Sequence, residues 1–120
     1  MKTLVTLLCL LVTSLATAQS VTGTIESVAE EFGNLETSLT DEELEPLSLK
    51  VGDHFSVTHG DQTVTVYYGK TYEDVEKGKW ISFLNWEKKL RLARSFANAA
   101  ETLDAKVGDE ITVSKIVATK

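Results

Sequence analysis

The two histidines are the first residues to consider, because paired imidazoles are common metal ligands. His54 and His59 lie five positions apart, so on one continuous strand their side chains face opposite sides. A zinc site usually needs four ligands in one place. We therefore expect no metal site and interpret the pair as polar residues beside a hairpin turn. No glycine-flanked serine or phosphate-binding loop occurs either, so we identify no catalytic residue.

Arg94 is a candidate for a ligand contact. It has the strand parity of Leu90, Leu92 and Phe96, which places it on the face expected to be buried. A buried guanidinium needs an anion, a carbonyl or a ligand, because burying it without a partner is costly. The equal alternative is that Arg94 reaches solvent at the end of the strand or pairs with a glutamate.

The segment Phe32-Gly33-Asn34 is a second candidate. Glycine beside asparagine between two strands is an ordinary turn signal. The Asn34 amide also offers a donor and an acceptor together, as the edge of an adenine ring requires. Tyr72, in the loop of residues 71–75, could supply a face on which a ring stacks. Taken one at a time, these residues are more typical of structural roles.

Strand patterns surround these candidates. Residues 54–59 and 63–68 alternate apolar with polar residues, and the turn residues of His59-Gly60-Asp61 predict a hairpin between them. Residues 79–86 carry Trp80, Leu84 and Trp86 on one face and apolar residues on the other. Such a strand is expected to be covered on both sides, by a closed barrel or by another subunit. Apolar and polar residues also alternate over residues 90–96, which predicts another strand. Residues 110–117 form the last predicted strand.

Helix and turn signals complete the pattern. Asn98 is a good N-cap, and Glu101 can complete a capping box, which predicts one short helix that ends near Ala105. The tetrapeptide Lys-Val-Gly-Asp occurs at residues 50–53 and 106–109, before a strand each time. We interpret it as one turn used twice. The acidic residues 41–46 are expected to form a solvent-exposed surface loop.

These elements predict an all-β (mainly β) fold: a small closed or nearly closed β-barrel of about seven strands with one short helix. Residues 1–18 have the charge, apolar run and small Ala16-Thr17-Ala18 motif of a cleavable signal peptide. We therefore expect an exported protein, periplasmic or secreted, whose residues 19–120 form a single domain. Cys9 is the only cysteine, so the exported chain would carry no disulfide.

The charge is acidic. The whole chain has a net charge of −6, from 12 basic and 18 acidic residues. Loss of Lys2 with the signal would leave 11 basic residues against 18 acidic ones, a net charge of −7. This excess repels phosphate backbones and anionic lipids. We therefore expect neither nucleic acid nor a membrane surface as a partner after cleavage.

Three segments, in order, resemble signatures of one known family. Residues 32–37, residues 71–78 and the stretch from Asn85 to Asp109 are similar to parts of the C-terminal domain of the S-adenosylmethionine hydroxide adenosyltransferases, relatives of the fluorinase and chlorinase enzymes. The resemblance spans roughly residues 21–117. It implies a β-barrel that packs against the catalytic N-terminal domain of a neighbouring subunit, with adenosine in the interface.

The resemblance also implies site residues. Asn34 would bond the adenine edge, Phe32 and Tyr72 would flank the ring, and backbone groups near Asn85 and Trp86 would take part. Arg94 matches an arginine of the halogenating members. The chain departs from the family where Trp86-Glu87-Lys88 replaces a Ser-x-Gly turn, because an indole there could fill or cap the pocket.

These observations favour a non-catalytic exported barrel that serves as an interaction or oligomerisation module, through self-association or a protein partner. The alternative is a module that binds adenosine or S-adenosylmethionine, and no cofactor is expected beyond such a ligand. The weakest reading is one half of a SAM-cleaving enzyme, because the catalytic domain of the family would have to come from a separate partner chain.

Overall fold

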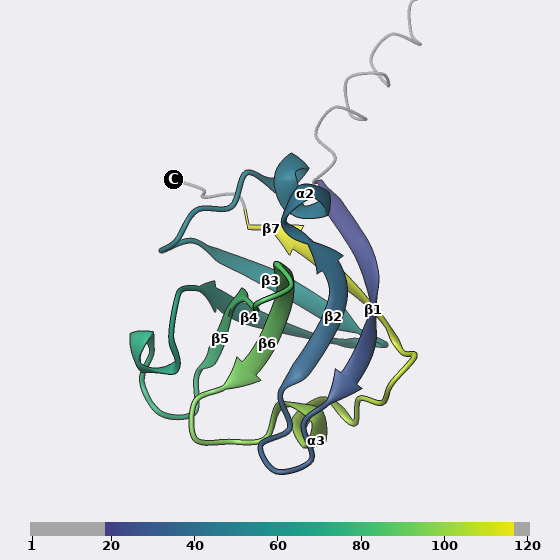
Figure 1. Cartoon of the computed structure of the whole chain (residues 1–120), viewed down its shortest axis with the longest axis vertical. Coiled ribbons are helices and arrows are strands. Elements are labelled where there is room, and N and C mark those ends of the chain that lie inside the picture. Colours follow the sequence, from purple (N-terminus) through teal and green to yellow (C-terminus); the bar gives the residue numbers. More distant parts are fainter. Residues whose placement is uncertain (1–18, 117–120) are drawn as a thin grey trace, which may run out of the picture.

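The alternating segments form seven strands that close into a barrel (Figure 1). The computed structural model describes residues 19–116. The strands are β1 (Ser20–Val28), β2 (Leu35–Thr40), β3 (His54–His59), β4 (Gln62–Tyr68), β5 (Trp80–Leu84), β6 (Lys89–Arg94) and β7 (Glu110–Lys115). The helical elements are α2 (Asp41–Leu44), α3 (Ala99–Leu103) and the short 3-10 helices η1 (Glu45–Leu47) and η2 (Tyr72–Asp74).

The order of the strands around the barrel is β1-β2-β6-β5-β4-β3-β7, and β7 pairs with β1 to close it. All pairs are antiparallel except β4 and β5, which run parallel. Because β4 and β5 run parallel, the connection between them, which contains η2, crosses over instead of forming a hairpin. The predicted fold class, a closed barrel of about seven strands with a short helix, is confirmed.

The barrel interior is filled by side chains that alternate along the strands. On β2, Leu35, Thr37 and Leu39 point inward, while the residues between them are half-buried. Thr37 donates a hydrogen bond to the carbonyl of Leu90 at 2.8 Å, which satisfies its hydroxyl inside the apolar core. All seven strands, η1 and α3 contribute the largest fully buried side chains: Ile25, Leu35, Leu39, Leu47, Phe55, Val57, Val66, Ile81, Leu90, Leu92, Leu103 and Ile111.

The hairpin and the repeated turn are confirmed. His59 pairs with Gln62, so the turn has two central residues, and Gly60 adopts a positive φ of 61°. In both Lys-Val-Gly-Asp copies the aspartate accepts a hydrogen bond from the lysine backbone N–H at 2.9 Å. Its own N–H returns a bond to the lysine carbonyl. One tetrapeptide therefore builds the same turn twice.

Two predicted strands are shorter than expected. The strand of residues 79–86 ends at Leu84, and Trp86 lies in the turn before β6 with 78 % of its surface exposed. The strand of residues 90–96 ends at Arg94, because Phe96 adopts a positive φ of 57°. Phe96 is consequently 81 % exposed and does not share the buried face of Leu90 and Leu92.

The helical segments differ in part from expectation. Asn98 caps α3 by accepting a hydrogen bond from the N–H of Glu101, as predicted, although the helix ends at Leu103. The acidic segment expected as a loop instead forms α2 and η1. A capping box between Thr40 and Glu43 begins α2, and the last residue of this helix, Leu44, is buried. No helix within residues 19–116 is long and apolar enough to span a membrane. The predicted signal peptide, residues 1–18, lies outside the described residues, as does Val117 of the last predicted strand.

Candidate functional site

A hollow of about 630 Å³ lies where the β1–β2 loop, η2 and the end of β6 meet. This volume falls within the roughly 300–1,000 Å³ range of small-molecule sites. Its wall is mostly apolar and aromatic. The lining residues are Glu31, Phe32, Asn34, Tyr72, Arg94, Ser95, Phe96, Ala97 and Asn98. Four of the six residues predicted as ligand contacts are therefore at one hollow, and Asn85 and Trp86 are not.

The β1–β2 loop presents Phe32 and Asn34 because of the glycine between them. Gly33 has a positive φ of 72°, and a Cβ at this position would lie 1.9 Å from Oδ1 of Asn98. Only glycine allows this approach. The Gly33 carbonyl accepts a hydrogen bond from the N–H of Ala100, which fastens the loop to the start of α3. Phe32 is left 62 % exposed beside the hollow.

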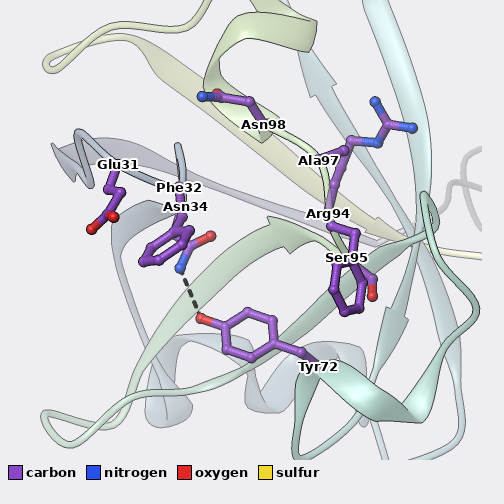
Figure 2. A pocket seen from close by; sticks show the side chains of 9 residues that line it. Glu31, Phe32, Asn34, Tyr72, Arg94, Ser95, Ala97 and Asn98 are labelled. Carbon is purple, nitrogen blue, oxygen red and sulfur yellow. Dashed lines mark hydrogen bonds between the residues drawn. The ribbon is translucent and has the colours of Figure 1, made fainter.

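Tyr72 is held in place by η2. Thr71 and Asp74 form a capping box around this 3-10 helix, and Tyr72 meets the ring of Phe83 edge-on, with the ring centres 5.1 Å apart. Nδ2 of Asn34 donates a hydrogen bond of 2.7 Å to the Tyr72 hydroxyl (Figure 2). Two residues that lie 38 positions apart in sequence thus converge as the resemblance implied.

A charged pair supports this contact from outside the hollow. Arg91 donates to Glu36 through Nε at 2.6 Å and to the Tyr72 hydroxyl through Nη1 at 3.3 Å. Both charged side chains are mostly buried, at 19 % and 18 % exposure. Burial alone would lower the pKa of Arg91, but the charge of Glu36 and the hydrogen bonds to Tyr72 and Glu36 outweigh it and raise the pKa. Arg91 is therefore always a cation.

Arg94 reaches the hollow without directing its charge into it. Its guanidinium donates two hydrogen bonds to the carbonyl of Gly78, at 2.9 and 2.7 Å, and a third to Thr102 at 3.1 Å. In Figure 2 the guanidinium points away from Asn34 and Tyr72. Of the options open from the sequence, the partner of Arg94 within this chain is a carbonyl and not a glutamate.

Asn85 and Trp86 contact the charged pair of Arg91 and Glu36. Nδ2 of Asn85 donates to the second oxygen of Glu36 at 2.8 Å. The Trp86 ring lies 5.6 Å from the guanidinium carbon of Arg91, as does the ring of Phe83. The sequence left open whether the Trp86 indole fills or caps the pocket. In the structure Trp86 is exposed and is not among the lining residues of the hollow.

The histidines have separate surroundings. His54 meets Tyr67 edge-on at 5.3 Å, whereas Nε2 of His59 lies 2.7 Å from Oδ2 of Asp109. The hydrogen bond from His59 and the backbone bond from Lys106 lower the pKa of Asp109. Within residues 19–116, no group of three potential metal ligands occurs.

Sequence reasoning missed Arg91 and Glu36. They are directly opposite each other in the β2–β6 register, and Phe83 is opposite Arg91 on β5. Arg91 lies in a strand predicted from the sequence, whereas Glu36 was identified only as part of the segment of residues 32–37. Their opposite charges have no meaning as a signal until the two segments are known to be neighbouring strands.

Comparisons with known proteins agree with this fold. An uncharacterized conserved protein from Thermotoga maritima has a similar structure, with a TM-score of 0.74 and 26 % identity over 78 % of this chain and 35 % of the other. A conserved hypothetical protein from Thermus thermophilus gives a TM-score of 0.56 and 25 % identity over 77 % of this chain and 34 % of the other. The chain thus spans about a third of the length of these structures.

No curated protein sequence matches the chain. The family model for the "SAM hydroxide adenosyltransferase C-terminal domain" matches residues 23–112, which include β2 to β6 in full, parts of β1 and β7, and every lining residue of the hollow. The chain therefore belongs to the family of SAM hydroxide adenosyltransferase C-terminal domains.

Proposed function

We propose that this domain is a non-catalytic, exported binding module whose hollow holds an adenine nucleoside, either adenosine or the adenosyl part of S-adenosylmethionine. The observation that carries the proposal is the hydrogen bond between Asn34 and Tyr72 beside an open aromatic hollow. The amide supplies hydrogen-bonding groups for the base edge. Phe32, Tyr72 and Phe96 supply faces on which the ring can stack.

The position of Trp86 favours nucleoside binding over a purely interactive role. The sequence alone favours the interaction module, because Trp86 and Glu87 alter the ligand motif more than they alter the fold. With Trp86 outside the lining, the hollow keeps a volume that suits a purine nucleoside. Export rests on the signal-like residues 1–18, and detection of the chain without this segment outside the cytoplasm would support it.

Calorimetric titration of residues 19–120 with adenosine tests the binding proposal. We expect saturable heat with adenosine and with S-adenosylmethionine, and at least about a tenfold loss of affinity in Asn34→Ala, the result of about 1.4 kcal/mol of lost interaction. Thr63→Ala, on the exposed part of β4, is the matched control. Absence of heat at about 1 mM ligand, where even weak binding is detected, would contradict the proposal.

The absence of catalysis is tested separately. Prolonged incubation with S-adenosylmethionine should yield no adenosine by chromatography. Release of adenosine above the rate without protein would show that the domain is catalytic.

A second candidate, an interaction surface, is favoured by a different observation. Phe32, Trp86 and Phe96 are 62 %, 78 % and 81 % exposed, and Phe32 and Phe96 both line the hollow. Neighbouring exposed apolar side chains are typical of an interaction surface. A second copy of the chain or a protein partner would cover them. Light scattering at increasing concentration tests self-association. A strict monomer in Phe96→Ser, together with a dimer in the parent, would support the surface, and a strict monomer in both would exclude self-association.

A further inference from the structure

The seam between β4 and β5 is the shortest part of the barrel's pairing. Within residues 19–116, β4 pairs with β5 only through Tyr67 and Tyr68. On its other side β4 pairs with β3 over residues 62–67, without a shift in register. Residues 62–66 therefore form a sheet edge that has no neighbouring strand on the β5 side in the described part of the chain.

The main chain of this edge presents hydrogen-bonding groups. The N–H of Tyr68 donates to the carbonyl of Asp53 at 2.8 Å, and bonded pairs alternate along an antiparallel ladder. The even-numbered residues of β4 therefore bond to β3, whereas the main-chain groups of Thr63 and Thr65 point away from it. Tyr67 has the same orientation, and its carbonyl accepts a hydrogen bond from a β5 side chain at 2.9 Å. Thr63 and Thr65 have no such main-chain partner among residues 19–116.

The segment before β5 binds the end of β6 instead of β4. The N–H of Gly78 donates to the Ser95 carbonyl at 2.6 Å, and the N–H of Ser95 donates to the Lys79 carbonyl at 2.9 Å. The carbonyl of Gly78 is taken by Arg94. A groove of about 690 Å³, the β4 groove, is left between this segment and β4. It is lined by His54, Thr65, Tyr67, Trp80, Arg94 and residues of the connection before β5.

The β4 groove passes through the sheet, because both faces of the sheet contribute to its lining. Thr65 is exposed beside the buried Val66 and so lies on the outer face. Trp80 is half-buried and packs against the core, as does Val64. A strand placed beside β4 would therefore direct alternate side chains to the solvent and toward Val64 and Trp80.

We propose that the β4 groove binds an extended polypeptide segment of a partner protein, which pairs its main chain with Thr63 and Thr65 and adds a strand to the sheet. Donors and acceptors recur at every second residue of a strand edge, and an extended main chain repeats them at the same spacing. The edge sequence Gln-Thr-Val-Thr-Val contains no proline, charged residue or bulge of the kinds that protect natural sheet edges.

The partner segment is expected to alternate apolar and polar residues, because one side meets Trp80 and the other meets solvent. This binding is separate from the proposed nucleoside function, since Asn34 and Tyr72 do not line the β4 groove. Failure of either proposal in its own titration leaves the other intact.

A blocked peptide that copies residues 62–66 is a suitable probe, because it has the required alternation. Two further peptides carry N-methyl groups on one or the other set of alternate amides, so that each has one edge without donors. Calorimetry with residues 19–120 should show binding of the unmodified peptide and at least about a tenfold loss of affinity for one methylated peptide, as two lost hydrogen bonds give. Equal affinity for all three peptides would overturn the proposal.

Variants of Thr65 test the protein side of the pairing. Thr65→Pro removes an N–H that points into the groove and makes no bond to β3, so peptide affinity should fall at least about tenfold. Thr65→Val keeps this N–H and the strand propensity, and it should bind within about twofold of the parent. A parental dimer that Thr65→Pro abolishes would overturn the assignment, because a second copy of the chain would then occupy the edge.

Hydrogen exchange in the nitrogen-labelled parent decides the matter even if Thr65→Pro does not fold. The amide hydrogens of Thr63 and Thr65 should exchange faster than those of Val64 and Val66 in the free protein. They should slow at least about tenfold at about 1 mM peptide, where even weak binding is detected. Slow exchange at Thr63 and Thr65 in the free protein, or no slowing with peptide, would overturn the inference.

Discussion

The hollow and the Lys106–Asp109 turn both join distant parts of the chain by side-chain hydrogen bonds, but they do so in opposite ways. In the turn, Asp109 binds the backbone N–H of Lys106 within its own tetrapeptide and receives His59 in addition. At the hollow, Tyr72 joins Asn34 to Arg91 through side-chain atoms alone, and the three residues come from different elements.

This difference distinguishes side chains that only stabilise the fold from side chains that can also bind a ligand. A side chain that satisfies nearby backbone groups stabilises one local conformation and has little left to offer a ligand. Side chains that bind one another across strands depend on the register of the barrel, and they can leave one donor or acceptor unused at the surface. On this criterion we propose the hollow as the recognition region and interpret the two Lys-Val-Gly-Asp turns as architectural.

Glycine substitutions should separate the hollow most strongly from a simple turn, here that of the β3–β4 hairpin. Gly33→Ala combines a positive φ with a collision against the N-cap Asn98, so we expect the free energy of unfolding to fall by about 2–4 kcal/mol. Gly60→Ala, at the hairpin turn, has the same sign of φ but open space around a Cβ. It should cost only about 1 kcal/mol. Urea unfolding measures both, and equal costs would show that the contact between Gly33 and Asn98 is unimportant.

Arg94→Met should affect stability and spare binding. Two charge-assisted hydrogen bonds to the Gly78 carbonyl are lost, which should lower the free energy of unfolding by about 1–2 kcal/mol. Because the guanidinium points away from Asn34 and Tyr72, adenosine affinity should change by less than about threefold, equivalent to roughly 0.6 kcal/mol. Calorimetry beside urea unfolding checks both. A tenfold loss of adenosine affinity in a folded variant would show that Arg94 contacts the ligand.

Trp86→Ala should have a smaller effect. The ring is 78 % exposed and contacts Arg91, so its removal should cost about 0.5 kcal/mol of stability, the value of an exposed cation–π contact. Adenosine affinity should fall slightly, because Arg91 loses one of its flanking rings. Titration with adenosine measures this effect. A clear gain in affinity would mean that the indole obstructs the hollow after all.

The smallest effect is expected at Asp109, and it depends on pH. The pKa of Asp109 is lowered from its ordinary value of 3.8 in the folded state, so its contribution to stability is present above that value and is lost as the pH falls through the folded pKa. The stability difference between the parent and Asp109→Asn should therefore shrink below about pH 4. Asp53→Asn, in the other copy of the tetrapeptide, is the control. Acid titration of unfolding in urea measures both, and a difference that grows on acidification would contradict the assignment.

The sequence by itself was sufficient for the barrel and for features made within a few residues. The β3–β4 hairpin, the α3 cap at Asn98 and the repeated turn depend on local backbone hydrogen bonds, and such signals are contained in adjacent residues. Local signals failed at the ends of strands. Trp86 and Phe96 continue an apolar alternation, but the chain turns before each of them. Before Trp86 the local turn signal was Asn85, whose side chain accepts hydrogen bonds from the N–H groups of Glu87 and Lys89.

The candidate site was only half predictable for a related reason. Phe32, Asn34 and Tyr72 were found through short motifs, whereas the roles of Arg91, Glu36 and Trp86 depend on which strands are neighbours and in what register. A change of register by one residue would turn Arg91 to the opposite face of the sheet. Closure of the barrel sets that register, so the sequence determined the fold and the groups available, and the tertiary structure decided which of them act together.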